Sequence, residues 1–265
     1  MHVARATLIA GFAAAASAVP SNPFLSPRAL TCPVSEVSCS GGSTDSCCVP
    51  DNGILVLSVQ WLTGYCASNS CNISPPNFWT IHGLWPDNCN GEQVGNCDKS
   101  RQYSDVAERL QAFDPSLFNT LQPVWPSFKG SDMSSYDAFW SHEWQKHGTC
   151  YSPATPSVIS RMFCFHNARE GQDVATFMSY TYELYRTYSL DTALANAGIT
   201  PGGSYALTDI DNAITSAYPN IQASYTCTQD GNLSEVHLGL FATPKGALTG
   251  PSTGDSNTCS GNVNY

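Results

Sequence analysis

Residues 54–61 read ILVLSVQW, an apolar run rich in β-branched residues that has the length of a buried strand. A second such run, FWTIHGL, occupies residues 78–84 and is stopped by Pro86. Near the end of the chain, residues 235–240 read EVHLGL, in which every second residue is apolar, as in a half-buried strand. These three runs predict a central antiparallel sheet.

The middle of the chain has helical patterns. Val106, Leu110 and Phe113 recur at i, i+4 and i+7 behind Ser104, which is a candidate N-cap. Further helices are expected near residues 136–148, 156–167, 173–188 and 209–217. No internal repeat or long linker is visible. The simplest fold is therefore one α+β domain, in which helices flank the sheet and disulfides pin the loops.

The charge balance excludes several classes of protein. Of 265 residues, 12% are charged, and 11 Lys and Arg against 21 Asp and Glu give a formal net charge of −10. A basic protein that grips the nucleic-acid backbone is excluded, because such proteins carry an excess of Lys and Arg. The hydrophobic content of 42% excludes a disordered chain. No run of about 18 or more apolar residues is present that could span a membrane.

The first 18 residues have the pattern of a secretory signal peptide. A weakly positive start at His2 and Arg5 precedes a short apolar run, and residues 16–18, ASA, fit a signal-peptidase site. The Pro- and Ser-rich residues 19–30 are expected to be disordered or trimmed. Residues 31–265 are then expected to form the folded, functional domain, and we expect it to be secreted, to the extracellular space or the vacuole.

The 12 cysteines behind this leader predict disulfides rather than free thiols or zinc ligands. Cys47 and Cys48 are adjacent, so each is expected to bond elsewhere in the chain. Cys66 and Cys71 are five apart, which suits a local bridge. Spacing alone leaves the other pairings open. The absence of a CxxC pair argues against a redox catalyst or a zinc ribbon.

Two histidine-bearing segments carry the candidate chemistry. Residues 79–87 read WTIHGLWPD and place His82 in an apolar strand, where a polar side chain is costly unless it is hydrogen-bonded or useful. A satisfied core histidine is the alternative interpretation. Residues 139–150 read FWSHEWQKHGTC. On a helix with about 100° per residue, one face carries four polar side chains: His142, Glu143, Lys146 and His147. The alternative is a solvated charged face, although Trp140 and Trp144 beside it favour partial burial.

The His-Glu pair at residues 142–143 does not fit a zinc protease. That motif needs histidines at i and i+4, whereas His142 and His147 are five apart and point in different directions. No cysteine cluster offers a replacement site. Neither a metal nor a cofactor is therefore expected.

Two histidines, a lysine and a glutamate suit the cleavage of RNA without metal. The 2′-hydroxyl must lose a proton to attack phosphorus, and the departing 5′-oxygen must gain one. Two imidazoles with pKa values near 6.5 can act as the base and the acid. A fixed ammonium such as Lys146 would stabilise the extra charge on pentacovalent phosphorus. The need for a 2′-hydroxyl confines this chemistry to RNA.

The segments IHGLWPD and SHEWQKHGTC resemble the two signature blocks of the ribonuclease T2 family, the secreted acid endoribonucleases of fungi, plants and animals. The cysteine layout extends the similarity over nearly all of residues 32–259, and the chain resembles fungal members most.

The resemblance implies a role for each polar residue of the two blocks. His82 and His147 match the acid–base pair, with His147 as the base and His82 as the acid. Glu143 and Lys146 match the residues that stabilise the pentacovalent state. His142 matches a phosphate-binding histidine.

The resemblance also implies two base pockets. Trp85 and Asp87 would hold the base on the 5′ side of the cut, and Gln60 and Phe139 would form part of the pocket for the following base. Fungal relatives often place a tyrosine where this chain has Gln93. Stacking on the first base is therefore expected to be weaker here.

The family's disulfide pattern can be carried over as well. It implies the bridges Cys32–Cys48, Cys39–Cys89, Cys47–Cys164, Cys97–Cys150 and Cys227–Cys259, and it leaves Cys66–Cys71 as the sixth. Two of these bridges would tie the catalytic blocks to the scaffold. Residues 63–77 look like an insertion. His166 and His237 fall outside both blocks and are predicted to be structural or surface residues.

The sequence thus predicts a secreted endoribonuclease that cuts single-stranded RNA through a 2′,3′-cyclic phosphate to 3′-phosphate ends. We expect a monomer that acts on RNA and not DNA, has no membrane attachment once the leader is removed, and offers Asn72 and Asn232 as glycosylation sites. One alternative is a secreted RNA-binding or cytotoxic effector whose role does not depend on turnover. A carbohydrate-binding module would account for the aromatic residues but not for the His/Glu/Lys face.

Overall fold

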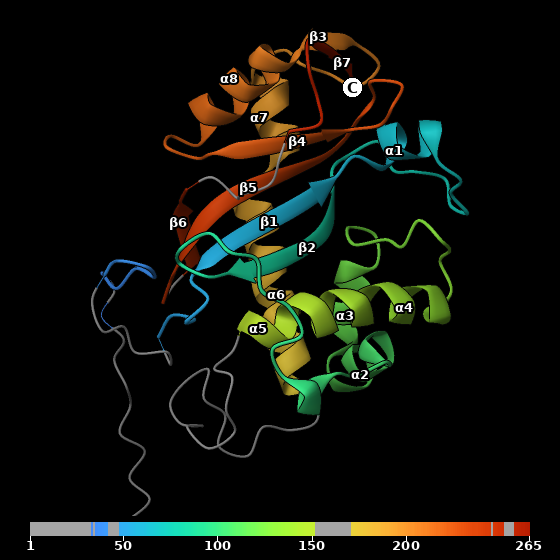
Figure 1. Cartoon of the computed structure of the whole chain (residues 1–265). Coiled ribbons are helices and arrows are strands. Elements are labelled where there is room, and N and C mark those ends of the chain that lie inside the picture. Colours follow the sequence, from blue (N-terminus) through green and yellow to red (C-terminus); the bar gives the residue numbers. More distant parts are fainter. Residues whose placement is uncertain (1–32, 34, 42–47, 152–170, 245, 252–256) are drawn as a thin grey trace, which may run out of the picture. The chain divides into compact units, whose positions relative to one another are not determined.

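Strand β1 (Ile54–Gln60) is central to the sheet, because it is paired along its whole length on both sides. The computed structural model describes residues 33, 35–41, 48–151, 171–244, 246–251 and 257–265. β1 pairs antiparallel with β2 (Thr80–Asp87) on one side and with β5 (Leu233–Thr243) on the other. β5 in turn pairs with β4 (Ala223–Cys227) and β6 (Gly246–Thr249), as Figure 1 shows.

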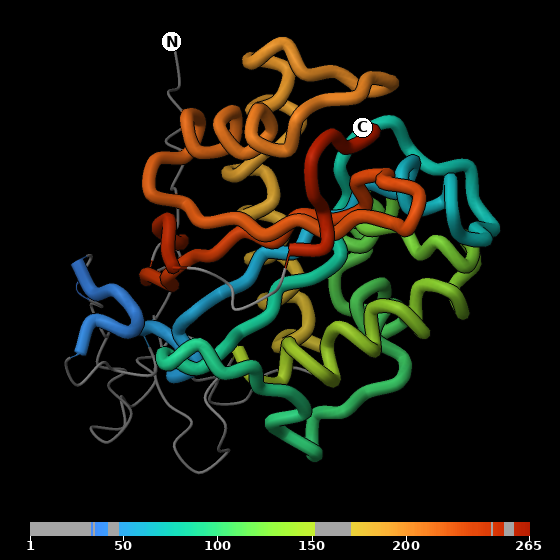
Figure 2. Tube along the Cα trace, turned by 45° about the horizontal axis from the view of Figure 1, so that its top comes forward, coloured from blue at the N-terminus to red at the C-terminus, as the bar shows by residue number. Residues whose placement is uncertain are grey.

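Helices and a short second sheet complete the described part of the chain. The helices are α1 (Leu62–Ser68), η1 (Lys99–Arg101), α2 (Val106–Phe113), α3 (Pro115–Leu121), α4 (Met133–Glu143), η2 (Trp144–Gly148), α5 (Thr149–Tyr151), α6 (Gln172–Thr187), α7 (Leu190–Asn196) and α8 (Leu207–Ala217). The second sheet pairs β3 (Ser204–Ala206) with β7 (Asn262–Asn264), next to the C-terminal end of the trace in Figure 2. The α+β architecture with an antiparallel sheet confirms the predicted fold class.

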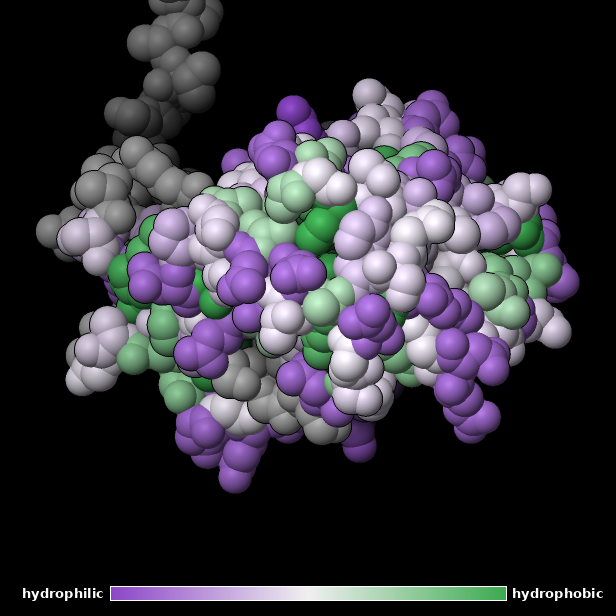
Figure 3. All heavy atoms as spheres, turned by 90° about the horizontal axis from the view of Figure 1, so that it is seen from above, coloured by the Kyte–Doolittle hydropathy of each residue, from purple (hydrophilic) through white to green (hydrophobic). Residues whose placement is uncertain are grey.

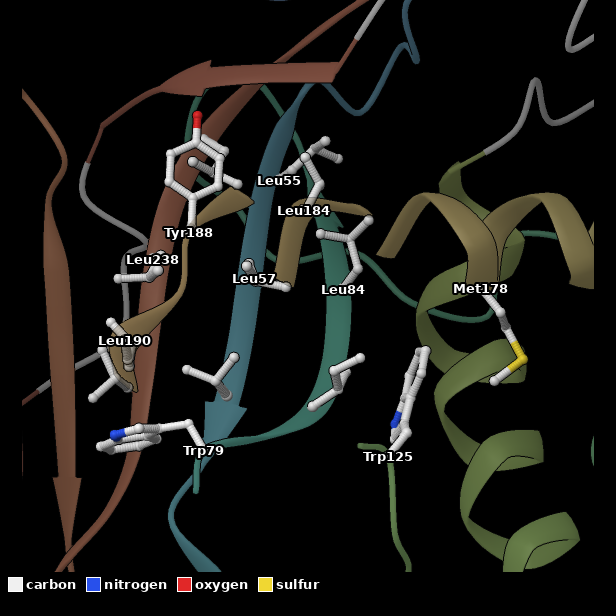
Figure 4. Packing of buried hydrophobic residues seen from close by; sticks show 14 of the residues in the cluster. Leu55, Leu57, Trp79, Leu84, Trp125, Met178, Leu184, Tyr188, Leu190 and Leu238 are labelled. Atoms are coloured by element: carbon white, nitrogen blue, oxygen red, sulfur yellow. The ribbon is translucent and has the colours of Figure 1, made fainter. Parts of the chain in front are cut away.

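The hydrophobic core lies between one face of the sheet and α6. Leu57 of β1 is in register with Leu84 of β2 and Leu238 of β5, and all three are fully buried. Figure 4 shows these side chains beside Leu184 of α6. Each buried leucine contributes about 1.5–3 kcal/mol relative to an exposed one. The opposite face of the same strands carries Ile54 and Val56 at one end and the polar residues Ser58, Gln60, Glu235 and His237 toward the other.

The helical segment expected at residues 136–148 is not one regular helix. α4 ends at Glu143, and residues 144–148 form a π-helical turn, η2, in which the Thr149 amide donates to the Trp144 carbonyl. The N-cap of α2 is Asp105 and not the expected Ser104. The Oδ1 atom of Asp137 in α4 accepts the first-turn amides of Ala107 and Glu108 instead. A side chain from another helix, and not the local Ser104, thus caps the N-terminus of α2.

Two of the other three expected helices are present in the described residues. α6 and α8 occupy the positions expected near residues 173–188 and 209–217. The helix expected at residues 156–167 lies outside the described residues, as does His166. Helices α1, α3 and α7 were not predicted, and α1 begins at the edge of the expected insertion.

Among the described residues, four of the six predicted bridges are present: Cys39–Cys89, Cys66–Cys71, Cys97–Cys150 and Cys227–Cys259. The predicted bridges Cys32–Cys48 and Cys47–Cys164 involve residues outside the described ranges. Residues Thr31–Tyr265 form a compact unit. The expected leader and trimmed segment, residues 1–30, are not among the described residues.

The surface matches the low charge content of the chain. The face seen in Figure 3 carries hydrophilic and intermediate residues, with hydrophobic ones in small separate patches. Leu248, with 52% of its surface exposed, is the one exposed large hydrophobic residue in the described ranges. None of the helices described here has the length and apolar character needed to cross a membrane.

Candidate active site

A β-bulge in β2 turns His82 away from the hydrophobic core. Ser58 of β1 pairs with Gly83, but the next residue, Val59, pairs with Ile81, which leaves His82 as an extra residue in β2. Without the bulge, strict alternation would place His82 on the core face with Leu84. The bulge instead places the His82 ring against Trp85 on the polar face, at 5.2 Å between ring centroids.

Gly83 leaves room for a buried carboxylate beside the bulge. A Cβ atom at this position would overlap Oε2 of Glu143 and lie 2.7 Å from Nε1 of Trp85. The Trp85 Nε1–H donates a hydrogen bond of 3.0 Å to that Oε2 atom. Oε1 of Glu143 lies 3.3 Å from Nε2 of His82, and Glu143 is only 2% exposed. The glycine of the first block therefore allows the carboxylate of the second block to reach His82.

The four polar residues that were expected to share one face divide into two pairs. Glu143 and His147 are buried, whereas His142 and Lys146 are exposed. The members of each pair are four residues apart, the spacing at which side chains share a helix face. The expectation of one common face therefore holds within each pair but not for all four residues. The segment presents a buried pair toward the sheet and an exposed pair toward solvent.

His147 packs flat against the same indole that contacts His82. Its ring stacks on Trp85 with 5.0 Å between centroids and 23° between planes. Only 7% of His147 is exposed, and no described residue hydrogen-bonds its Nδ1 atom. One tryptophan thus separates the two histidines of the candidate acid–base pair.

The surroundings of His82 favour its protonated form. Burial lowers the pKa of His82, but the charges of Glu235 and Glu143 outweigh this effect and raise the pKa well above its ordinary 6.5. Burial raises the pKa of Glu143, yet the nearby His82 and His147 and the Trp85 hydrogen bond bring that pKa below its usual value. His82 and Glu143 therefore form an ion pair in the resting site.

The surroundings of His147 favour its neutral form. Burial lowers the pKa of His147, and nearby Lys146, His82 and His142 lower it further. The attraction of Glu143 offsets only part of this, and the pKa falls to about 4. The two histidines therefore carry different charges over the range between these two pKa values.

Glu235 and His237 of β5 belong to the site, although the sequence analysis assigned neither of them to it. Oε1 of Glu235 is in contact with Nδ1 of His82 and accepts a hydrogen bond of 3.1 Å from Ser58 Oγ. Oε2 of Glu235 lies 3.2 Å from Nε2 of His237. His237 is buried and contacts Trp85 at 4.9 Å between centroids, so a surface position for it is wrong. The alternation of residues 235–240 placed both on one strand face but did not say what that face meets.

The expected base-pocket residues lie at opposite ends of the paired strands. Gln60 is opposite Thr80 and Asp87 is opposite Ile54, so His82 falls between them. Gln60 is buried and donates to the Ile81 carbonyl at 3.1 Å, while Asp87 is buried and accepts from the Val94 amide at 3.4 Å. Phe139 of α4 is half-buried, with its ring 5.7 Å from that of His82. Gln93 is exposed and forms an isolated bridge with Asp87.

Residues 96–101 hold the π-helical turn in place. The Asn96 amide donates to the Lys146 carbonyl at 2.9 Å, and Arg101 Nη2 donates to the Thr149 carbonyl at 2.9 Å. The Cys97–Cys150 disulfide links the same two segments, three residues beyond His147. In the ranges that the structure describes, no group of three or more His, Cys, Asp or Glu residues is arranged to hold a metal ion.

Comparison with known proteins adds independent information. The sequence model of the Ribonuclease T2 family matches residues 52–256. Ribonuclease Rh of Rhizopus niveus is 36% identical over 240 residues, which are 89% of this chain and 92% of that protein. A solved structure of Actibind, described as a T2 ribonuclease and antitumorigenic agent, is similar with a TM-score of 0.74 and 30% identity, covering 89% of this chain and 98% of that one. A variant of RNase MC1 solved with 5′-GMP has a TM-score of 0.57 and 25% identity, covering 80% of this chain and 100% of that one.

Proposed function

The chain belongs to the ribonuclease T2 family and is an endoribonuclease, and from this premise we propose that it cleaves single-stranded RNA by metal-independent acid–base catalysis. The products would be a 2′,3′-cyclic phosphate first and a 3′-phosphate end after hydrolysis.

One observation carries this proposal: two histidines that contact the same tryptophan and interact with one buried carboxylate have pKa values shifted in opposite directions. His82 has a raised pKa and His147 a pKa of about 4, so between these values one imidazole can donate a proton and the other can accept one. Environments that push two pKa values apart are how active sites assign an acid and a base. His82 is therefore proposed as the acid and His147 as the base.

In the first step, neutral His147 takes the proton of the 2′-hydroxyl as that oxygen attacks phosphorus. The bond from phosphorus to the 5′-oxygen breaks, and His82 gives its proton to the departing oxygen. The products are a 2′,3′-cyclic phosphate and a 5′-hydroxyl. Each proton transfer is worth about 10²–10⁴-fold in rate.

The second step uses the two histidines in reversed roles. Neutral His82 takes a proton from water as the water oxygen attacks phosphorus, and protonated His147 returns its proton to the 2′-oxygen. The cyclic ester opens to a 3′-phosphate, and both histidines regain their starting charges.

Lys146 is proposed as the cation that stabilises the phosphorane and His142 as a phosphate-binding side chain, and both are exposed beside the buried pair. Glu143 is anionic in the free site, so its charge does not suit direct contact with a more negative phosphorus. We assign Glu143 to keeping His82 protonated, which differs from the role that the resemblance implied.

The proposed base pockets lie on the two sides of His82 along the strand pair. Trp85 and Asp87 lie toward one end of β2, and Gln60 and Phe139 would serve the other side. Such a division suits the two nucleotides that flank one phosphodiester. The 5′-GMP in the RNase MC1 complex supports a nucleotide ligand for this family's site. Discrimination against DNA would follow from the need for a 2′-hydroxyl.

The proposal includes secretion of residues 31–265 as a monomer after loss of the leader. It is supported by the signal-like residues 1–18 and by the disulfides, which persist in oxidising compartments. Glycosylation is proposed at Asn72, which is exposed, and at Asn232, which is half-buried.

The test uses the purified protein, single-stranded RNA and EDTA. We expect His82→Ala and His147→Ala each to lower kcat by about 10²–10⁴-fold while circular dichroism stays unchanged, because each removes one proton-transfer group. Glu108→Gln, at an exposed position of α2, is the matched control and should keep full activity. Chromatography of the products should show 2′,3′-cyclic phosphates that convert to 3′-phosphates. Full activity of either histidine variant, or loss of wild-type activity in EDTA, would contradict the proposal.

A second candidate is a cytotoxic effector whose role does not depend on turnover. The description of Actibind as antitumorigenic is the observation that favours it. A folded His82→Ala protein that retained full toxicity to cultured cells would support this candidate, and loss of toxicity together with catalysis would reject it.

A further inference from the structure

The Glu235 carboxylate is shared between two histidines from different strands. Oε1 of Glu235 contacts Nδ1 of His82, and Oε2 lies 3.2 Å from Nε2 of His237. The acid–base scheme above uses neither Glu235 nor His237. We therefore ask what a partly buried carboxylate that bridges two imidazoles contributes to the site.

The sheet register explains how Glu235 reaches His82 across an intervening strand. In β5, Glu235 is opposite Gln60 and His237 is opposite Ser58, so both point to the same face. β1 lies between β5 and β2, and neighbouring strands are about 4.8 Å apart. Ser58 of β1 lies under the contact between Glu235 and His82. Its side chain is small, and its hydroxyl donates a hydrogen bond of 3.1 Å to Oε1 of Glu235. A larger residue at position 58 would block the path between the two side chains.

The contact determines which nitrogen of His82 exchanges its proton. Because Glu235 engages Nδ1, the proton on that nitrogen is held and Nε2 is left as the exchanging nitrogen. Nε2 is the atom that faces Glu143. In addition, the backbone carbonyl of His82 accepts a hydrogen bond of 2.8 Å from Trp125 Nε1, so the main chain is held as well.

We propose that Glu235 is a positioning residue for the catalytic acid, holding the Nδ1 side of His82 while His237 holds the other carboxylate oxygen. This inference rests on the proposed role of His82. His237 is the structural partner of the carboxylate, and Glu235 acts on the reaction only through His82.

The electrostatics of the cluster agree with this geometry. The titratable groups that face His82 are Glu143 from α4, His147 from η2 and Glu235 from β5, and His237 faces Glu235. Burial raises the pKa of Glu235, but His82 and His237 together hold it well below its usual range. Glu235 is therefore a permanent anion at working pH, and its charge is the largest influence that raises the pKa of His82.

The test compares charge with shape at position 235. Glu235→Gln keeps the size and the hydrogen-bonding capacity but removes the charge, whereas Glu235→Asp keeps the charge on a shorter arm. The readouts are NMR titration of the His82 ring, assigned by comparison with His82→Asn, and the pH dependence of kcat/KM on a dinucleotide. Loss of a neighbouring opposite charge should lower the His82 pKa by about 1–3 pH units.

We expect Glu235→Gln to shift both the His82 titration and the alkaline limb of kcat/KM to lower pH. In Glu235→Asp, which keeps the charge, both should lie close to their wild-type values. His237→Gln should leave the His82 pKa at or above that of the wild type. An equal downward shift in His237→Gln would contradict the inference, since it would show that packing rather than the carboxylate charge sets this pKa.

Two further results separate this inference from the proposed function. If His82→Ala is inactive but Glu235→Gln titrates like the wild type, the positioning role fails and the proposed function stands. If His82→Ala is fully active, the proposed function fails and the positioning role fails with it. If Glu235→Gln does not fold, NMR titration of His82 in the wild-type protein still tests the inference. A His82 pKa at or below 6.5 would overturn it.

Discussion

Trp85 is the residue around which the site is arranged. Its indole contacts the rings of His82, His147 and His237, and its Nε1–H donates to Glu143. The resemblance implied that this tryptophan lines a base pocket. In the structure the same ring packs among the titratable groups. Because the proposal gives Trp85 both duties, its replacement is expected to change binding and catalysis together.

The opposite pKa shifts of the two histidines predict a bell-shaped pH profile. His147 must be neutral to act as a base, so kcat/KM should fall as the pH drops through about 4. His82 must be protonated to act as an acid, so the alkaline limb should lie above 6.5. The measurement is kcat/KM on a dinucleotide, whose small charge limits the effect of the acidic protein surface. An acid limb centred at 6.5 or higher would contradict the assignment of His147.

Two irregular elements build the site, the β-bulge at His82 and the π-helical turn after Glu143. The bulge moves one histidine from the core face to the polar face, and the π turn directly follows the buried Glu143 and contains the buried His147 and the exposed Lys146. Both are deviations from regular geometry that are over-represented next to functional sites. Gly83, next to the bulge, lies against the carboxylate of Glu143, the last residue of α4.

The close approach at Gly83 predicts a large effect of one methyl group. In Gly83→Ala the new Cβ would overlap the Glu143 carboxylate, so Glu143 or β2 must shift. We expect kcat to fall about 100-fold, because misplacing a catalytic group by about 1 Å can cost that much. Urea unfolding should show a loss of about 1–3 kcal/mol from overpacking.

Gly95→Ala is the matched control for this substitution. Its Cβ would meet the Lys146 carbonyl oxygen at 3.4 Å, an ordinary contact distance, so activity and stability should stay near those of the wild type. Wild-type kcat in Gly83→Ala would show that the carboxylate does not depend on this close packing.

At the scale of the whole molecule, an acidic protein acts on a polyanion. The formal net charge is −10, which rules out tight gripping of the RNA backbone by counterion release. The site nevertheless groups His142 and Lys146 with a His82 whose pKa is raised. A local cationic pocket can process one phosphodiester and release it, so the overall charge limits affinity and not chemistry.

The disulfides divide into those that frame the site and those that do not. Cys97 and Cys150 are 53 residues apart and link the segment before η1 to the end of the π-helical turn. Replacing both by serine should lower the free energy of unfolding by about 2–5 kcal/mol and also lower kcat, because the chain around His147 loses its anchor.

The Cys66–Cys71 bridge supplies the control, since it links α1 to a residue only five positions further along the chain, outside both histidine-bearing segments. Its double serine variant should lose less stability, because the loop it closes is short, and should keep kcat unchanged. Urea unfolding and initial rates on single-stranded RNA would measure both effects. Equal losses of kcat in the two variants would contradict a framing role for Cys97–Cys150.

The sequence by itself determined the chemistry of the site and most of the sheet. Periodicity located β1, β2 and β5, and the two blocks supplied His82, Glu143 and His147, because residue types and spacings within one segment are local properties. Tertiary structure alone decided which faces these residues occupy. The bulge exists only through pairing with Ser58, and it reverses the side that alternation predicts for His82.

Glu235 shows the same limit over a longer distance. It lies 153 residues from His82 in the chain and becomes its partner only because β5 and β2 flank β1. The pKa values of the two histidines depend on such partners and on burial, neither of which local sequence contains. The sequence therefore identified the groups that we propose move protons, while the folded sheet decides which of them would carry the proton at the start.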